Sequence, residues 1–267
     1  MRILFAFCKF LGFVFACLIC VPPQILIMFF TKGSASRVLP VLWMKLICFI
    51  FQIRVRVEGE PYKGGHVILM CNHLSYLDII AIGSVIPHSF VSREDVANWP
   101  LIGFLAGLRQ TAYVVRGSSD PVLASKGVES RLKAGDSLVI FPEGTSTDGR
   151  NVRDFKTGVF ARAIDAKVSE LMIQPATLFV KKSDGRAVKT QDDRDLYAWH
   201  IDMDEDFGLF DHLWRFAQTS GSYLNLCFHE PIAVQDYNDR KILAKDTHKA
   251  VSNGLVDLLQ MHKQQER

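Results

Sequence analysis

The stretch Cys71-Asn72-His73-Leu74-Ser75-Tyr76-Leu77-Asp78 lies at the junction of two elements that the sequence predicts. The apolar run His66–Met70 before it is short enough for a buried strand. Ile79–Ile82 after it is typical of the first turns of a buried helix. A histidine and a carboxylate therefore occupy a strand-to-helix junction, where α/β sheets usually expose their catalytic groups.

Whether His73 can contact Asp78 depends on where that helix begins. Within one regular helix, residues five apart point about 140° away from each other, because each residue turns roughly 100°. Ser75-x-x-Asp78 is a capping-box pattern, which predicts Ser75 at the N-cap and Asp78 in the first turn. Helical side chains lean toward the N-terminus, so Asp78 would face His73 and could stabilise its imidazolium. The residues fit a plain helix cap beside a polar loop histidine equally well.

The composition sets broad limits on the class of protein. The chain has 267 residues, enough to bury one full core, and 49% of them are hydrophobic, which is high for a soluble protein. A formal charge of +3 gives no indication of nucleic-acid binding. Cys17-x-x-Cys20 has no second Cys or His pair nearby, and the histidines are scattered without ligand spacing. The sequence therefore predicts no metal site.

The first fifty residues hold much of the excess hydrophobicity. Residues 10–30 form an apolar run whose only strongly polar member is Gln24, long enough to cross or enter a bilayer. Pro22-Pro23 should kink or break this helix. A signal peptide is the competing interpretation, although the run is long and shows no clear cleavage site. A second apolar helix is predicted at Val38–Phe51, and the surrounding basic residues suit a re-entrant or interfacial hairpin at least as well as a simple span.

Strands and helices alternate through the rest of the chain. Strands are predicted at Gln52–Glu58, His66–Met70, Ser89–Ser92, Ala112–Val115, Ser137–Phe141, Ile173–Val180, Trp199–Met203 and Tyr223–His229. Helices are predicted within Trp99–Leu108, from Pro121 to about Ala134, and at Gly158–Lys167, Phe207–Phe216 and Arg240–Gln260. The alternation in Gln52–Glu58 favours a sheet edge, Pro175 favours an edge or a bulge, and Lys181–Asp195 is predicted to be a surface loop or excursion.

This order predicts the α/β class. We expect a single mixed, largely parallel sheet flanked by helices, with an N-terminal apolar helical membrane segment. The predicted organisation is residues 1–51 as membrane-associated helices and residues 52–267 as the α/β domain.

Three predicted strand ends carry side chains that could take part in binding or catalysis. They are His73 with Asp78, Arg116, and Glu143-Gly144-Thr145. The carboxyl ends of parallel strands share one edge, so all three could line one cleft. Arg116 precedes a predicted helix N-terminus and could hold a phosphate, although alone it fits a surface arginine better. The Glu143 loop could accept hydrogen bonds from substrate hydroxyls or direct N–H groups at a thioester oxyanion, or be an ordinary turn. Lys156 adds a cation near the next helix.

Several reaction classes are excluded by pattern. The sequence has no Gly-x-Ser-x-Gly elbow, no Walker loop and no paired-glycine dinucleotide fingerprint. Since no candidate nucleophile stands beside His73, its natural role is general base toward a substrate hydroxyl.

Four ordered blocks of the sequence resemble those of the glycerolipid acyltransferases. They are Asn72-His73-x-x-x-x-Asp78 (the HX4D motif), Tyr113-Val114-Val115-Arg116, Phe141-Pro142-Glu143-Gly144-Thr145 and Ile173-Gln174-Pro175-Ala176. The type most similar is the bacterial 1-acyl-sn-glycerol-3-phosphate acyltransferase. The resemblance covers Val55 to Val180 and the apolar N-terminus. The first and third blocks are specific, and the other two are loose.

The resemblance implies a reaction and a location. His73 would deprotonate an acceptor hydroxyl that attacks the thioester of acyl-CoA or acyl carrier protein, and Asp78 would orient His73. The acceptor's head group would be bound by Arg116, Glu143, Gly144, Thr145 and Lys156. The implied partners are membrane lipid, a lyso-lipid acceptor and the acyl donor, with no cofactor and no nucleic acid. The implied place is the cytoplasmic face of the bacterial inner membrane, in phospholipid biosynthesis.

The sequence departs from the family pattern after Thr145. Many members have Arg-Ser there, whereas this chain has Ser146-Thr147-Asp148-Gly149-Arg150, so Lys156 or Arg150 would have to supply the missing cation. The expected acceptor is lysophosphatidic acid (1-acyl-glycerol-3-phosphate). A lyso-ornithine lipid is the alternative, because Trp199–Pro231 is similar to relatives that acylate it. Two other classes are a catalytically degenerate lipid-binding membrane protein and a hydrolase that releases free fatty acid.

Overall fold

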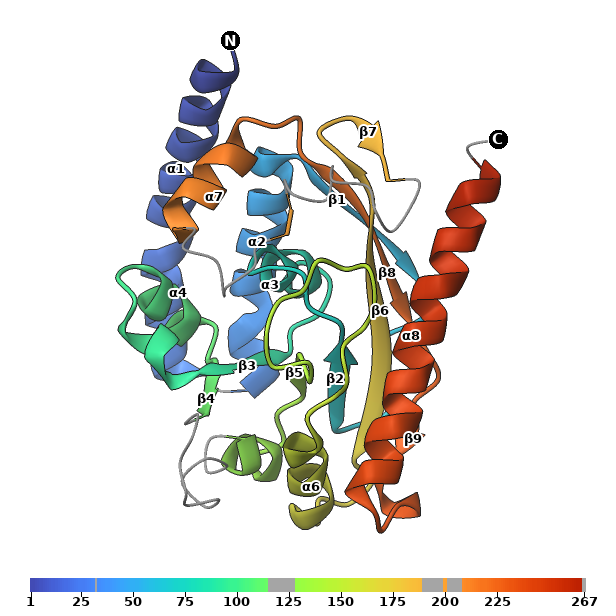
Figure 1. The fold of residues 1–267 in the computed structure, drawn as a ribbon. Helices are drawn as coiled ribbons and strands as arrows, with labels where there is room; N and C mark the ends of the chain where they lie inside the picture. Colours follow the sequence, from blue (N-terminus) through green and yellow to red (C-terminus); the bar gives the residue numbers. More distant parts are fainter. Residues whose placement is uncertain (32, 115–127, 189–198, 201–207, 266–267) are drawn as a thin grey trace.

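A mixed β-sheet forms the centre of the molecule (Figure 1). The computed structural model describes residues 1–31, 33–114, 128–188, 199–200 and 208–265. Its strands are β1 (Ile53–Glu58), β2 (Val67–Cys71), β3 (Ser89–Arg93), β4 (Ala112–Val114), β5 (Leu138–Ile140), β6 (Met172–Ser183), β7 (Arg186–Ala187), β8 (Ser222–Phe228) and β9 (Ile232–Ala233). The spatial order is β1-β8-β6-β2-β5-β3-β4, with β7 and β9 also paired to β6. Pairing is parallel except where β7, β8 and β9 meet β6, which confirms the predicted fold class.

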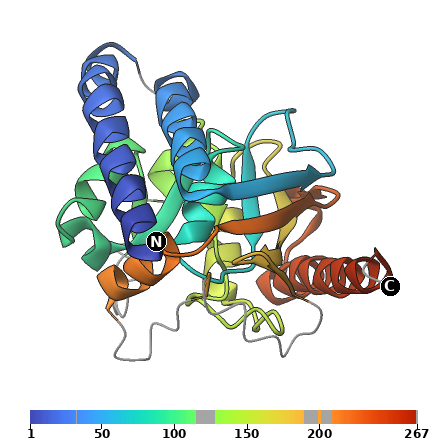
Figure 2. The ribbon, with the colours of Figure 1, turned by 90° about the horizontal axis from the view of Figure 1, so that it is seen from above.

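Helices cover both faces of this sheet (Figure 2). They are α1 (Arg2–Phe30), α2 (Val38–Phe51), α3 (Leu77–Gly83), α4 (Ile102–Leu108), α6 (Thr157–Asp165), α7 (Leu209–Ala217) and α8 (Arg240–Gln265), and residues 128–133 are also helical. Successive residues of β2 point to opposite faces, so Leu69 and Cys71 join the core beneath α2 and α3, whereas Ile68 and Met70 join the core beneath α6 and α8. β2 is thus buried on both sides, as its unbroken apolar run predicts.

The first two helices form a hairpin, and α2 has the predicted bounds. Pro22 and Pro23 lie inside one continuous helix, so the helix does not break there, and the predicted kink stays a prediction. A proline pair removes two backbone donors, but α1 packs along α2, α4 and α7, and such tertiary packing overrides local propensity. By length and composition, α1 is apolar enough to cross a membrane.

Two buried polar side chains fasten α1 to the rest of the protein. The Lys9 ammonium donates a hydrogen bond to the Thr219 carbonyl (2.8 Å). The Gln24 amide donates to the carbonyls of Ser36 (2.9 Å) and Leu108 (3.2 Å). These two anchors lie about 22 Å apart along the helix axis. The helix therefore rests along the α/β domain, while many of its large apolar side chains remain exposed. The division at residues 51 and 52 stays a prediction.

Pro175 does not lie at a sheet edge, which corrects one of the two predicted alternatives, while a bulge fits the one-residue shift in register between the pairs Ala176–Phe228 and Ile173–Ile232 on either side of it. It lies in β6, at the centre of the sheet, paired with Met70 of β2. On its other side the partner of β6 changes from β8 to β9, and there the Pro175 carbonyl accepts the His229 N–H (2.9 Å). Pro175 has no N–H to donate to the His229 carbonyl. That carbonyl accepts a hydrogen bond from the Gln174 side-chain amide instead (3.1 Å). A side chain thus replaces the hydrogen bond that proline cannot make.

Two further predictions concern segments that are described only in part. Of the predicted loop or excursion Lys181–Asp195, the described residues form an excursion, in which β6 continues to Ser183 and turns into β7 through Asp184-Gly185. Trp199 and His200 belong to no strand, and residues 201–203 lie outside the described part of the chain. Trp199 is instead buried in a turn, inside the core cluster beneath α2 and α3.

Candidate active site

His73 and Asp78 contact each other at the carboxyl end of β2. His73 Nδ1 lies 2.8 Å from Asp78 Oδ2. The Asp78 side chain is 0% exposed, whereas that of His73 is 19% exposed. The imidazole is stacked on the Phe141 ring at 4.0 Å between centroids. Because Nδ1 faces the carboxylate, Nε2 is the ring nitrogen left for a substrate.

The local geometry that allows this contact differs slightly from the predicted cap. The helix α3 begins at Leu77 with Tyr76 at the N-cap, one residue later than expected. The Ser75 hydroxyl accepts the Leu77 N–H (3.2 Å), and the Asp78 carboxylate accepts the Ser75 N–H (3.0 Å). Of the two hydrogen bonds of a capping box, the one from the Ser75 N–H to the Asp78 carboxylate therefore forms, whereas the Ser75 hydroxyl bonds the Leu77 N–H and not that of Asp78. His73 lies before the helix, which is the condition for its contact with Asp78.

Four donors converge on the Asp78 carboxylate. Its Oδ2 atom faces His73 Nδ1 and accepts the backbone N–H groups of Leu74 (2.6 Å) and Ser75 (3.0 Å). Its Oδ1 atom accepts the indole N–H of Trp199 (2.7 Å). Buried carboxylates need such donors, because desolvation otherwise disfavours the charged form. The arrangement can hold one imidazole tautomer and stabilise an imidazolium.

Glu143 lies directly behind the His73 backbone. One carboxylate oxygen accepts the His73 N–H (2.7 Å) and the other accepts the Arg153 N–H (2.8 Å). Burial raises the pKa of Glu143 to about 7, although these N–H groups and the nearby His73 oppose that shift. The side chain is 2% exposed. Its contacts favour a role in holding the two loops together, and its predicted contact with substrate stays a prediction.

The turn after Glu143 places an exposed glycine beside a lysine. Gly144 has φ = 77°, a left-handed conformation that favours glycine, and its N–H closes the turn on the Phe141 carbonyl (3.1 Å). A Cβ at this residue would lie 3.5 Å from Lys156 Cγ. Lys156 is exposed at the start of α6, and Thr145 is half-buried. Of the predicted substrate-binding residues, Glu143 thus contacts His73 and Gly144 lies beside Lys156, whereas Arg116 lies outside the described residues.

Other contacts that the motifs did not predict fix the same loop. Thr147 donates its N–H (2.8 Å) and its hydroxyl (3.1 Å) to the His73 carbonyl. The Asn72 amide bonds both the N–H (2.7 Å) and the carbonyl (2.9 Å) of Leu178 in β6. Trp199 and Thr147 were missed because they lie 121 and 74 residues from their partners. The one available signal for Trp199 is that a buried indole needs an acceptor.

Known proteins are similar to this chain in sequence and in fold. The family model described as Acyltransferase matches residues 53–178. The lyso-ornithine lipid O-acyltransferase of Brucella abortus is 31% identical over 225 residues, covering 82% of this chain and 82% of that protein. The chain belongs to the acyltransferase family.

Further relatives of this acyltransferase carry a second name. The 1-acyl-sn-glycerol-3-phosphate acyltransferase of Neisseria gonorrhoeae is 31% identical over 74% of this chain and 72% of that protein. The crystal structure of the 1-acyl-sn-glycerophosphate acyltransferase of Thermotoga maritima matches with a TM-score of 0.68 and 19% identity, over 97% of this chain and 98% of that one. At that identity the structural likeness supports the fold alone. The family assignment confirms the predicted enzyme class.

Proposed function

We propose that this acyltransferase moves a fatty acyl group from a thioester, acyl-CoA or acyl carrier protein, to the free hydroxyl of a lyso-lipid. The observation that carries the proposal is the His73–Asp78 contact, with Nδ1 held and the imidazole partly exposed. His73 Nε2 takes the hydroxyl proton while the hydroxyl oxygen attacks the thioester carbonyl. The new C–O bond forms, the C–S bond breaks, and the proton passes to the departing thiolate. Asp78 stabilises the imidazolium between these steps.

A lyso-ornithine lipid is the acceptor that the observations favour, ahead of the lysophosphatidic acid expected from the motifs. In the sequence comparison, the Brucella abortus relative with that name matches 82% of this chain, whereas the Neisseria gonorrhoeae glycerophosphate enzyme matches 74%. The loop after Thr145 also uses its polar groups internally, since Thr147 bonds the His73 carbonyl and Arg150 pairs with Asp148 (3.5 Å). An ornithine head group carries an ammonium and a carboxylate, so it needs fewer cations than a phosphate monoester.

The proposed location is a membrane surface, with α1 and α2 inserted in the interface. Large apolar side chains are exposed along both helices, including Phe7, Phe15, Phe30 and Phe49. The buried anchors at Lys9 and Gln24 hold α1 along the protein, which favours a helix lying in one leaflet over a helix that spans the bilayer. The membrane surface we propose is the cytoplasmic face of a bacterial inner membrane, because the acyl thioesters that serve as donors are found in the cytoplasm.

The experiment is lipid profiling of a bacterial host that lacks its own lyso-lipid acyltransferase and expresses the full chain. We expect the acylated form of the acceptor to appear with wild type, and the His73→Ala variant to lose it. His66→Ala is the matched control, because His66 stands at the opposite end of β2 and should leave transfer intact. Ornithine lipid formation supports the favoured acceptor, and phosphatidic acid formation supports the second.

Two other functions give different outcomes in the same host. A hydrolase would release free fatty acid from labelled thioester at the same rate without any lyso-lipid. A lipid-binding protein with a degenerate site would transfer no label in isolated membranes. Transfer that His73→Ala retains, with the variant present in the membrane at the wild-type level, would overturn the proposed mechanism.

A further inference from the structure

An indole from outside the four sequence motifs reaches the carboxylate behind the proposed base. Trp199 Nε1 donates a hydrogen bond of 2.7 Å to Asp78 Oδ1. Both side chains are 0% exposed. The donor comes from a residue 121 positions away along the chain, so the contact is made by the fold rather than by the local loop.

The two oxygens of Asp78 depend on different parts of the chain. Oδ2 faces His73 and two backbone N–H groups, all within the loop that follows β2. Among the described residues, Trp199 is the one donor found at Oδ1. Without that N–H, Oδ1 would be a buried anionic oxygen lacking a partner, a costly state that favours rotation of the carboxylate. Rotation would disturb the contact between Oδ2 and His73.

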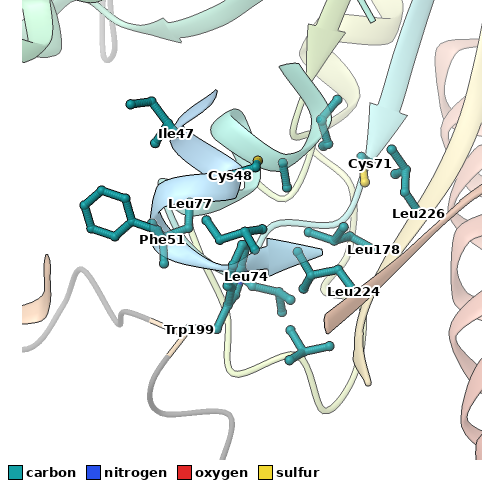
Figure 3. Close-up of a cluster of buried hydrophobic side chains, with 14 of the residues drawn as sticks. Ile47, Cys48, Phe51, Cys71, Leu74, Leu77, Leu178, Trp199, Leu224 and Leu226 are labelled. Carbon is teal, nitrogen blue, oxygen red and sulfur yellow. The ribbon is translucent and has the colours of Figure 1, made fainter. Parts of the chain in front are cut away.

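The indole is itself held in place by aromatic packing. Its ring meets Phe216 of α7 edge to face, at 5.7 Å between centroids and 84° between planes. Phe216 in turn stacks on Phe51 at the end of α2 (6.4 Å). Figure 3 shows Trp199 within the buried cluster that also contains Leu74 and Leu77, which lie between His73 and Asp78 in the sequence. The donor is therefore fixed by helices α2 and α7, and an indole N–H can only donate.

We propose that Trp199 is a positioning residue for acyl transfer, which acts through Asp78 by fixing the plane of its carboxylate. The inference rests on the proposed role of His73 and Asp78 as a catalytic pair. Trp199 touches no substrate in this scheme. It keeps Oδ2 directed at His73 Nδ1, so that the imidazole is held in the tautomer and orientation that a general base requires.

The first test is the Trp199→Phe variant of the full chain in detergent or vesicles, assayed with labelled acyl thioester and lyso-lipid. Phenylalanine keeps a ring against Phe216 and removes the N–H. We expect kcat to fall by about 10- to 100-fold, the size of one charge-assisted hydrogen bond, and KM for both substrates to stay within about threefold. Trp43→Phe is the matched control, since Trp43 borders the same cluster and packs on Phe13 (6.0 Å), and it should leave kcat unchanged.

The second test repeats Trp199→Phe in an Asp78→Asn background under single-turnover conditions. Residues that act as one unit are non-additive, so the loss from Trp199→Phe should shrink to less than about threefold there. An equal fold loss in both backgrounds would mean that Trp199 acts through general packing, and would overturn the inference. Wild-type kcat in Trp199→Phe, with His73→Ala inactive, would also overturn it. Full activity in His73→Ala would instead remove the proposed function, and this inference with it.

Discussion

Two buried aspartates, Asp78 and Asp136, are held by opposite kinds of partner. Asp78 contacts one imidazole, two backbone N–H groups and one indole. Asp136 contacts two guanidinium groups, those of Arg37 (2.8 Å) and Arg131 (3.2 Å). Arginine stays protonated, so the two partners of Asp136 keep their positive charge throughout any reaction. Asp78 has a partner whose charge changes during a proton transfer. The burial of a carboxylate thus says little about its function, whereas the identity of its donors does.

The two aspartates also hold different parts of the molecule. Arg37 ends the 3-10 turn between α1 and α2, and it donates to the Pro87 carbonyl (2.7 Å) as well as to Asp136. Asp136 lies in the turn before β5, so this pair fastens the apolar hairpin to the α/β domain. We therefore expect substitutions at Asp78 to change the reaction and substitutions around Asp136 to change stability.

The largest effect should come from Asp78→Asn. The amide keeps the shape but loses the charge that stabilises the His73 imidazolium, and it permits the wrong imidazole tautomer. We expect kcat to fall roughly 10³- to 10⁴-fold, as in other histidine–carboxylate pairs. Asp136→Asn is the matched control and should keep kcat for each folded molecule. Activity above about a tenth of wild type in Asp78→Asn would break the distinction between the two aspartates.

Next in size is Arg37→Met, which leaves Asp136 buried with one guanidinium. Removing one partner of a buried ion pair costs about 3–5 kcal/mol of unfolding free energy when an uncompensated charge stays buried. Arg131 still faces the Asp136 carboxylate, so we expect a loss at the lower end of that range. Arg93→Met is the control: its pair with Asp95 (2.7 Å) has side chains 45% and 47% exposed, so about 0–1 kcal/mol is expected. Denaturant titration of both variants in detergent measures the difference, and equal losses would contradict it.

The two aspartates also show how much the sequence can predict. The five-residue spacing and the cap pattern allow Asp78 to face His73, because both are local and backbone geometry limits the options. They fit a plain helix cap equally well, and the family resemblance is what favours the contact. The strand-end position of Glu143 followed from the parallel sheet, although its bonds to backbone N–H groups did not. The alternation of elements was enough to predict the α/β class.

Contacts between distant segments could not be predicted in this way. The Arg37–Asp136 pair joins residues 99 apart, and Trp199 reaches Asp78 across 121 residues. No local periodicity encodes such partners, which depend on how layers pack. The predicted edge position of Pro175 is wrong for the same reason, since the Gln174 side chain that compensates for the missing N–H belongs to tertiary structure. The predicted roles of the site residues stay predictions until variants are assayed.

Glu143 is a third buried carboxylate, and in the described part of the chain it pairs with backbone N–H groups and with no cationic side chain. Burial raises the pKa of Glu143 to about 7, so the folded chain binds this proton more tightly than the unfolded chain does. Its contribution to stability is therefore full below about pH 4.5 and is lost as the pH rises to about 7. Glu143→Gln should flatten this part of the stability curve, by at most about 3 kcal/mol. Denaturant titrations across that range would contradict the assignment if the two curves ran parallel.

The smallest effect is expected from Tyr76→Phe, which removes a contact that involves no carboxylate. The Tyr76 hydroxyl lies 2.9 Å from His212 Nδ1 and joins the catalytic loop to α7. Burial raises the pKa of Tyr76 and lowers that of His212 to about 4, so both groups are neutral at pH 7. A neutral hydrogen bond contributes about 0.5–1.5 kcal/mol, and kcat should change less than about threefold. In a His212→Ala background the same substitution should cost almost nothing further. A loss of kcat as large as that of Asp78→Asn would place the Tyr76 hydroxyl in the reaction itself. The charge of a side chain's hydrogen-bond partner would then no longer distinguish catalytic residues from structural ones.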